Sequence, residues 1–550
     1  MNTMESLYFT RSPPNNSMRK LILLYLLSFN VMAMDLYVDN KTKQIYAEPG
    51  SNRVLMGSFE KVSSEPVATK SEVTAIKQDL ELKNNEIKAL SEFVAEANGP
   101  ESAHVSLKDG IHFATKDGNF TAGINGRMQV DSQINEQTLP DAYQGQYISS
   151  TGVPATLNSG AGLRRGRLGV EGTFFKKTDY KFEYDFTRGN GLNAGGITDA
   201  YIRYNFTKPF SLKVGSFKEP FSLEEATSNR YTTFIERNMA VNTFVDNLNT
   251  YKVGIGANYA VDRWQIGSSF QTEGVGGYNN AYGSNSLTGS TGSAVNTNGG
   301  VNRNGGGGDT SWEANTRVSG TPWMSSKTKF LHVGASGSYI SLNNNYTGNG
   351  TYNNGGVIFA NGVGGNVDRT AILNTGNLTS NGLKTAKNST EADTLTRFGA
   401  ESALVHGPFS AQGEYIQTNV SGKGYDNAVL DGYYGYATYF LTGESRNYKA
   451  KTGAWDRIKP NRNFDMKGGW GAWEVASGYD YMNLNSGGVK GGKADTVKFG
   501  INWYPHSHLR VMTDYVHVLD INTATVSNPT SKAWNNASLD MVETRFQLDW

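Results

Sequence analysis

The stretch Tyr180-Lys-Phe-Glu-Tyr-Asp-Phe186 carries the pattern that decides the fold. Residues 180, 182, 184 and 186 are all aromatic, and the residues between them are Lys181, Glu183 and Asp185. Successive side chains of a β-strand point to opposite faces of the sheet. This segment therefore predicts a strand with one aromatic face and one charged face.

The same alternation recurs after residue 105, in segments 200–206, 409–415, 497–503 and 542–550. In a soluble sandwich the apolar face would pack on a second sheet. Aromatic residues near the strand ends and a densely charged opposite face instead fit a transmembrane β-barrel, with lipid outside and water inside. A secreted β-sandwich or β-helix is the alternative, and no short repeat supports a β-helix.

The joins between the predicted strands alternate in length. Short joins at 175–179, 207–209 and 260–262 are typical of periplasmic turns, and long joins such as 131–162 and 218–250 of extracellular loops. Two Gly-, Asn- and Ser-rich stretches, 273–310 and 341–391, are expected to be mobile extracellular loops without core-forming residues. Roughly 440 residues are left for strands and loops, which allows about 16 strands around an aqueous channel.

The composition narrows the functional classes. The 550 residues hold 51 Lys and Arg, 50 Asp and Glu, and no Cys. This excludes a disulfide scaffold and a thiolate metal site, and the balanced charge argues against nucleic-acid binding. The pair His506 and His508 lacks a third metal ligand, and no nucleophile elbow is present. We therefore expect no enzyme, cofactor or metal; a barrel hydrolase or an adhesin is the alternative.

The N-terminus indicates export. Arg19 and Lys20 precede an apolar run over 21–33, which is too short to span a bilayer and ends at the small residue Ala33. Residues 1–33 are therefore predicted to be a signal peptide, with a membrane anchor as the alternative. Met18 is a candidate for the true start. Residues 34–66 form a short segment with strand-like pieces.

A heptad pattern follows in segment 67–99, which ends at Asn98-Gly-Pro100. Apolar residues at its a and d positions predict a coiled-coil helix for self-association, with a single amphipathic helix packed on a domain as the alternative. The predicted trimerisation residues are Val73, Ile76, Leu80, Ile87, Leu90 and Val94. The barrel is then predicted to occupy residues 100–550.

Several segments in one order resemble the phosphate-selective porin O/P family of Gram-negative outer membranes. They are 163–168, 221–228, 236–238, 409–415, 432–444 and 500–504. The resemblance implies a 16-stranded antiparallel barrel in outer-membrane lipid, assembled as a homotrimer with the coiled coil as a periplasmic clasp. It also implies that loop 218–250 folds into the lumen as the constriction. A terminal strand that ends on Trp550 implies the barrel assembly machinery as a transient partner.

Basic side chains along the lumen are what an anion-selective pore needs. Strand parity directs Arg127, Arg165, Arg167 and Arg203 inward, and Arg230 and Arg237 lie in the loop expected to form the constriction. The resemblance to phosphate-specific members points to Arg127, Arg164, Arg165 and Asp199 as matching positions. For each arginine the alternative is a lumenal charge that is merely paired with a nearby acid.

Glu225 is the departure from the family pattern, because phosphate-specific members carry Lys there. A carboxylate at the neck would repel phosphate. The loop over 218–250 also holds five acids against three bases. We therefore expect a porin for passive diffusion of small solutes and ions, with anions including phosphate preferred but without high phosphate specificity. A general or weakly cation-selective porin is the alternative.

Overall fold

The computed structural model describes the chain in the following ranges: 34–59, 70–97, 103–107, 110–140, 147–148, 153–154, 156–187, 196–246, 251–272, 294–295, 308–309, 312–342, 344–346, 352–354, 357–365, 367–376, 378, 392–422 and 428–550. The chain divides into two units, residues 1–97 and residues 98–550, which are described separately. The predicted signal peptide over residues 1–33 lies outside the described residues.

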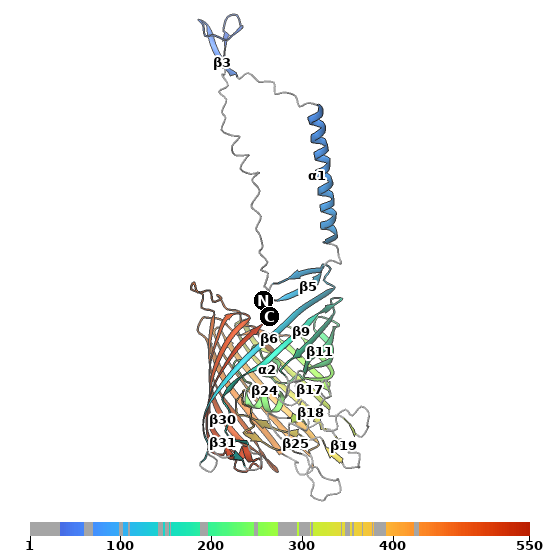
Figure 1. The fold of residues 1–550 in the computed structure, drawn as a ribbon, viewed down its shortest axis with the longest axis vertical. Helices are drawn as coiled ribbons and strands as arrows, with labels where there is room; N and C mark the ends of the chain where they lie inside the picture. The colour runs from blue at the N-terminus through green and yellow to red at the C-terminus, as the bar shows by residue number, and fades with distance from the viewer. Residues whose placement is uncertain are drawn as a thin grey trace, which may run out of the picture. The chain divides into compact units, whose positions relative to one another are not determined.

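The N-terminal unit holds a small sheet and a long helix (Figure 1). Strands β1 (Met34–Asp39), β2 (Ile45–Tyr46) and β3 (Arg53–Phe59) form an antiparallel sheet in the order β2-β1-β3. The guanidinium of Arg53 lies 3.5 Å from the centre of the Tyr46 ring, which links the outer strands across one face.

Helix α1 (Lys70–Ala97) covers the heptad segment. Its seam residues Ile76, Leu80, Ile87 and Leu90 are 61–65% exposed in the single chain. The side chains of Val73 and Val94, the other two predicted seam residues, lie outside the described part of the helix. Within the described chain, no helix is both long enough and apolar enough to cross a membrane.

The second unit is a closed antiparallel barrel of sixteen strands, which confirms the predicted fold class. In chain order its strands are β6 (Phe120–Thr138), β9 (Gly160–Phe174), β10 (Thr178–Asp185), β11 (Gly196–Asn205), β12 (Phe210–Lys218), β13 (Tyr251–Ala260), β14 (Trp264–Gln271), β17 (Trp312–Ser326), β18 (Lys329–Ser341), β24 (Thr394–His406), β25 (Phe409–Ser421), β26 (Ala428–Phe440), β29 (Ala472–Ser486), β30 (Val489–His506), β31 (Leu509–Asn522) and β32 (Ser538–Asp549).

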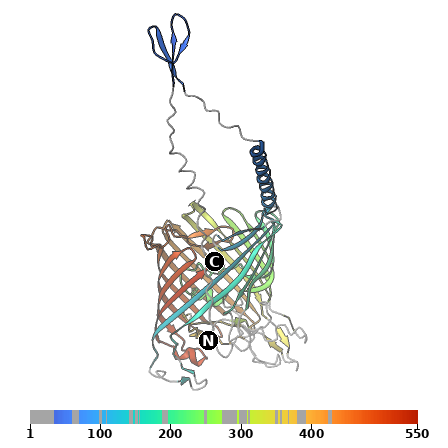
Figure 2. The ribbon, with the colours of Figure 1, turned by 45° about the horizontal axis from the view of Figure 1, so that its top comes forward.

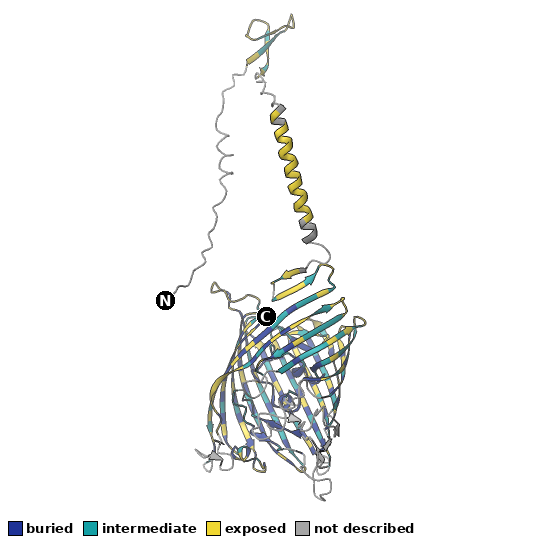
Figure 3. Ribbon diagram, turned by 45° about the vertical axis from the view of Figure 1, so that its right-hand side comes forward, coloured by how far each residue is buried: buried dark blue, intermediate teal, exposed yellow. Residues whose placement is uncertain are grey.

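Residue alternation along the strands follows the sequence prediction (Figure 3). Phe182 and Phe499 face outward and are about half exposed, whereas Glu183 between the aromatic positions of β10 is buried in the lumen. Outward apolar side chains meet lipid, and inward charged side chains meet one another or water. The charged lumen is therefore built by the same two-residue period that builds the strands.

The first and last strands close the barrel, and Figures 1 and 2 show β6 running obliquely beside the C-terminal strands. Strand β32 pairs with β6 with Phe546 opposite Val130. Trp550 donates a hydrogen bond to the Gly126 carbonyl and its own carbonyl accepts one from the Gly126 amide, both at 3.1 Å. A Cβ on residue 126 would lie 2.3 Å from the Trp550 ring, so only glycine fits there. On the part of β6 that precedes Gly126, the ladder continues with β5 (Ile111–Thr115), which forms a hairpin with β4 (Ala103–Ser106).

Short turns gather at one end of the barrel, as between β9 and β10 or between β24 and β25. The join between β26 and β29 departs from this pattern. It runs over residues 441–471 at the same end and contains the hairpin of β27 (Asn447–Lys449) and β28 (Ala454–Asp456). The sequence did not predict a long segment at the turn end.

Short elements accompany the long loops. They are β7 (Tyr147–Ile148), β8 (Val153–Pro154), β15 (Ala294–Val295), β16 (Gly308–Asp309), β19 (Asn344–Tyr346), β20 (Tyr352–Asn354), β21 (Val357–Ile358), β22 (Ala360–Asn361), β23 (Leu373–Asn374) and helix α4 (Pro529–Ala533). The prediction that 341–391 lacks core-forming residues is wrong for part of that loop. Val357, Phe359, Ile372 and Leu373 are fully buried in the largest apolar cluster of the barrel.

Candidate constriction in the barrel lumen

Loop 218–250 enters the lumen and is almost wholly buried between Glu219 and Val245. It contains α2 (Leu223–Ala226), α3 (Met239–Val241) and a π-helical turn, η2 (Asn242–Asp246). The Ser222 hydroxyl accepts a hydrogen bond from the Glu225 amide at 3.2 Å, as the capping-box spacing predicts. The loop is thus an ordered part of the barrel interior.

Carboxylates on three wall strands hold the backbone amides of this loop. Glu414 on β25 accepts hydrogen bonds from the amides of Leu223 and Glu224 at 3.1 and 2.8 Å. Asp480 on β29 accepts one from Met239 at 2.7 Å, and Asp514 on β31 accepts one from Ile235 at 2.6 Å. These four hydrogen bonds attach loop 218–250 to strands β25, β29 and β31.

Arginines on other wall strands hold the loop carbonyls in the same way. Arg510 on β31 donates to Thr232, Arg545 on β32 to Ile235, and Arg397 on β24 to Phe244, each at 2.7 Å. The apolar side of the loop packs as well. The Phe234 ring meets Tyr436 edge to face at 5.6 Å, and Phe244 meets Phe359 at 5.5 Å.

Two acids of loop 218–250, Glu219 and Glu236, are paired with bases of the barrel wall. Glu219 pairs with Arg397 at 2.8 Å and with Lys252 at 3.0 Å. Glu236 pairs with Arg164 at 2.8 Å and lies 3.6 Å from Arg545. The count of five acids against three bases within the loop therefore misses bases supplied by distant strands.

Glu225, the residue that departs from the family pattern, is fully buried. Its carboxylate contacts the Lys218 ammonium and lies 3.0 Å from the Arg237 guanidinium. Burial raises the pKa of Glu225 to about 6, against the opposing effect of these two cations. The carboxylate is thus compensated within the loop and does not stand free in the lumen.

Most of the predicted pore arginines form ion pairs. Glu183 accepts from Arg127 at 2.8 Å and from Arg167 at 2.9 Å, and Arg167 also pairs with Asp185 at 2.6 Å. The Arg127 guanidinium further donates to the Asn229 side chain. For these two arginines the geometry matches the alternative of a lumenal charge paired with an acid.

The remaining predicted residues are spread over the turn end and the neck. Arg203 pairs with Asp179 at 2.7 Å, and Asp199 pairs with Lys181 at 3.2 Å. Arg230 lies 3.6 Å from Asp549. Arg237 is part of the Glu225 cluster and Arg164 of the Glu236 cluster, so the structure does not gather the nine residues into one site.

Arg165 differs from the other arginines. Its guanidinium donates to the Gln129 side-chain oxygen at 3.0 Å, and it forms no ion pair with any acid of the described chain. Only 6% of the residue is exposed. A guanidinium keeps its charge in a protein, so Arg165 contributes an uncompensated positive charge beside the constriction loop.

Segment 441–471, which the sequence did not point to, enters the lumen from the turn end and meets the constriction loop. Arg446 donates to the Thr233 hydroxyl and, at 3.1 Å, to the Tyr231 carbonyl. The Trp455 amide donates to the Thr227 hydroxyl at 3.2 Å, and its indole N–H donates to the Gln412 side-chain oxygen at 2.5 Å. The buried Trp455 in an otherwise polar stretch was the available sequence signal.

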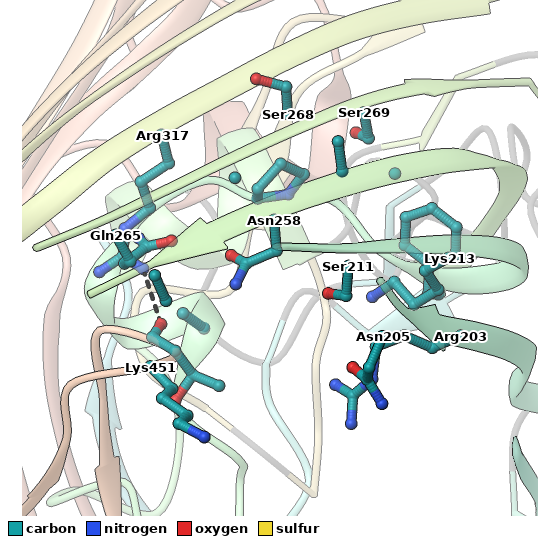
Figure 4. Close-up of a pocket in the computed structure, with 18 of the residues that line it drawn as sticks. Arg203, Asn205, Ser211, Lys213, Asn258, Gln265, Ser268, Ser269, Arg317 and Lys451 are labelled. Carbon is teal, nitrogen blue, oxygen red and sulfur yellow. Dashed lines mark hydrogen bonds between the residues drawn. The ribbon is translucent and has the colours of Figure 1, made fainter. Parts of the chain in front are cut away.

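Two pockets flank segment 441–471 in the turn-end half of the lumen. One has a volume of about 540 Å³ and is lined by β11 to β14, by Lys218–Pro220 of the constriction loop and by Lys451 and Thr452 (Figure 4). The other has a volume of about 720 Å³ and is lined in part by Lys449, Asp456 and Arg457. The segment thus contributes basic side chains to both pockets.

Comparison with known proteins places this geometry in a family. The family model described as phosphate-selective porin O and P matches residues 142–550. Porin O of Pseudomonas aeruginosa is 28% identical over 426 residues, which cover 75% of this chain and 86% of that protein. An uncharacterized protein of Caulobacter vibrioides is 25% identical over 457 residues, which cover 82% and 78%.

Among solved structures, the outer membrane protein OmpT of Vibrio cholerae aligns with a TM-score of 0.43 and 12% identity, covering 78% of this chain and 98% of that one. The family model spans most of the sequence. It contains every strand of the barrel except the first, β6. The chain therefore belongs to the phosphate-selective porin O and P family and is an outer-membrane porin.

Proposed function

We propose that this porin carries small solutes and ions by passive diffusion with a preference for anions, phosphate among them, and that loop 218–250 sets its narrowest part. The uncompensated charge of Arg165 is the observation that carries the preference. The wall acids Glu414 and Asp514 accept hydrogen bonds from the amides of Glu224 and Ile235, and neither forms an ion pair with Arg165. Excess positive charge along a pore favours anions.

Charge compensation at the neck supports the same proposal. Glu225 would oppose anions if it stood free, but Lys218 and Arg237 flank it. Family membership points to a channel rather than an enzyme. The family's name alone does not fix phosphate specificity in this chain, and Glu225 remains the residue at which we expect it to differ from phosphate-specific members.

A reversal-potential measurement in a planar bilayer under a KCl gradient tests the proposal. We expect the reversal potential of the wild type to have the sign of an anion-selective channel. In the Arg165→Gln variant, the reversal potential should lie closer to zero. The matched control is the double variant Asp179→Asn with Arg203→Gln, which removes an existing ion pair and leaves the net charge unchanged. A reversal potential at zero or of cationic sign in the wild type would overturn the proposal and favour a general or weakly cation-selective porin.

We further propose a homotrimer in which α1 is a periplasmic clasp. Ile76, Leu80, Ile87 and Leu90 form an exposed apolar seam in the single chain, and such a seam is stable in water only against other helices. Asn at both Leu80 and Ile87 should lower the trimer fraction in chemical cross-linking of whole cells. Asn at Lys77 and Lys88 is the control, and equal trimer fractions in both variants would contradict the clasp.

Export by residues 1–33 and recognition of the strand ending on Trp550 by the barrel assembly machinery complete the proposed route to the outer membrane. The pairing of Trp550 with Gly126 supports a terminal residue that is needed for closure. Deletion of Trp550 should lower the amount of folded barrel in the outer membrane. Normal folded levels of that variant would contradict this role.

A further inference from the structure

We infer that the pocket of about 540 Å³ beside loop 218–250 is a binding site for small organic anions that also carry hydroxyl groups, such as phosphorylated sugars. This inference rests on the proposed anion preference and names a class of solute for it. Pockets of 300–1,000 Å³ are typical of small-molecule sites, and a bare inorganic anion would leave most of this volume to water.

The positive end of the pocket is Lys213 on β12. Its ammonium lies 4.0 Å from the centre of the Phe217 ring, and it forms no ion pair within the described chain. Lys208 and Lys451, which also line the pocket, likewise have no carboxylate partner among the described residues. The pocket's acids are already engaged, since Asp179 pairs with Arg203 and Glu219 with Arg397. An anion entering the pocket thus meets cations without competing carboxylates.

A neutral polar pair lies next to Lys213. Ser211 on β12 is directly opposite Asn258 on β13 in the strand register, so their side chains share the lumenal face. Neither side chain has a hydrogen-bond partner among the residues the structure describes, and both line the pocket together with Lys213 (Figure 4). A hydroxyl and an amide that are free to donate and accept are suited to the hydroxyl groups of a polyol.

Glycines allow Phe217 and Pro220 to pack closely against this part of the wall. Gly256 is opposite Lys213 in the register, and Gly267 is opposite Asn258 on the next strand. A Cβ on residue 256 would come within 3.0 Å of the Phe217 ring, so no larger side chain is accommodated without a shift. The Phe217 ring, which the Lys213 ammonium contacts, thus packs against Gly256, and the ammonium, the hydroxyl and the amide all line the same pocket.

This arrangement should bind anions that carry hydroxyl groups more tightly than anions that carry none. Lys213 attracts any anion, including chloride and inorganic phosphate. Ser211 and Asn258 add hydrogen bonds only for an anion whose hydroxyl groups extend a few ångströms from its charge. A site that merely attracts anions by charge would not need the amide–hydroxyl pair.

The test is block of chloride current through the purified full-length porin in a planar bilayer, with glucose 6-phosphate or inorganic phosphate added at the turn-end side. We expect glucose 6-phosphate to half-block at a concentration roughly three- to tenfold below that of inorganic phosphate, as one or two extra hydrogen bonds provide. Ser211→Ala and Asn258→Ala should remove this difference. Lys213→Gln should weaken block by both anions, and Lys490→Gln on β30 should change neither.

The outcomes separate this inference from the proposed function. Loss of anion preference in a KCl gradient would overturn the proposed function and with it the site. Anion preference with equal block by the two phosphates, unchanged in Asn258→Ala, would overturn the site alone. As a reading independent of current, calorimetric titration of the detergent-solubilised porin should give glucose 6-phosphate binding that Asn258→Ala weakens; unchanged binding in that variant would also overturn the site.

Discussion

Two segments that enter the lumen from opposite ends of the barrel differ in how far the sequence predicted them. Loop 218–250 enters between β12 and β13, where long joins were expected, and segment 441–471 enters between β26 and β29, where a short turn was expected. Both are held by backbone hydrogen bonds to charged or aromatic residues, and they contact each other through Arg446 and Trp455. Both segments therefore occupy the lumen, one from each end of the barrel, whereas the alternation of join lengths predicts a long segment at the loop end alone.

Removal of the inner hairpin is expected to have the largest effect. Replacing residues 447–456 with a short Gly-Ser linker takes Trp455 and Lys451 out of the lumen and joins the two pockets that flank them. Single-channel conductance should rise at least about twofold, because a pore's conductance follows its narrowest wetted section. The heat-modifiable band on gels checks that the variant barrel is folded. If the folded variant has unchanged conductance, loop 218–250 alone limits the current.

Loosening of the predicted loop is the next test. Phe234→Ala removes the buried ring that packs on Tyr436, at a cost of about 3–5 kcal/mol in packing free energy. The loop should then move, and single-channel records should show added open-channel noise. Phe182→Ala, which truncates a lipid-facing ring, is the matched control. Equal noise in both variants would mean that the hydrogen bonds from the wall suffice.

Acidification should change selectivity through loop 218–250 and not through segment 441–471. Burial raises the pKa of Glu225 to about 6, so its charge is lost as the pH falls from 7.5 to 5. Lys218 and Arg237 then lose this carboxylate, and Arg237 keeps its weaker pair with Asp246 at 3.8 Å. Anion preference of the wild type in a KCl gradient should therefore rise on acidification. The Glu225→Gln variant should already show this higher anion preference at pH 7.5. An identical pH response of the wild type and Glu225→Gln would exclude this carboxyl as the cause.

The smallest expected effect concerns the contact between the two segments. Trp455→Phe keeps the aromatic ring but loses the indole hydrogen bond to Gln412, which contributes about 1 kcal/mol. Conductance should stay near the wild-type value, and the temperature at which the folded band is lost should fall slightly. A large rise in conductance would show that this single hydrogen bond positions the whole hairpin.

The strands could be predicted because their signal is local. Two-residue alternation is visible in any single strand such as β10. The number of strands was predicted from the length of chain that is left for strands and loops and from the family resemblance, and the barrel has sixteen. The charge state of the constriction could not be predicted in this way. Glu219 is neutralised by Arg397, and Glu236 by Arg164, pairs that lie far apart in the chain and meet only across the lumen.

The buried segments 357–378 and 441–471 could not be predicted either, because their sequences carry no periodic pattern that signals burial. In 357–378 the buried Phe359 and Ile372 are interspersed among Gly, Asn and Asp, so no periodicity marks them as core. In 441–471 the buried Trp455 stands among Lys, Thr and Gly. Their burial depends on where the barrel ends, which is a property of the whole sheet and not of the segment.

The seam between β6 and β32 sets an order of events in assembly. Gln129 and Gln547, which are 418 residues apart, share a hydrogen bond across this seam, and Trp550 is the last residue of the sequence. Such a contact closes a very long stretch of chain, so local hairpins form much faster than it does. Until the final strand arrives, β6 presents a free edge that can pair with other chains. If β32 is delayed or removed, chains in which the other strands have already paired should therefore aggregate.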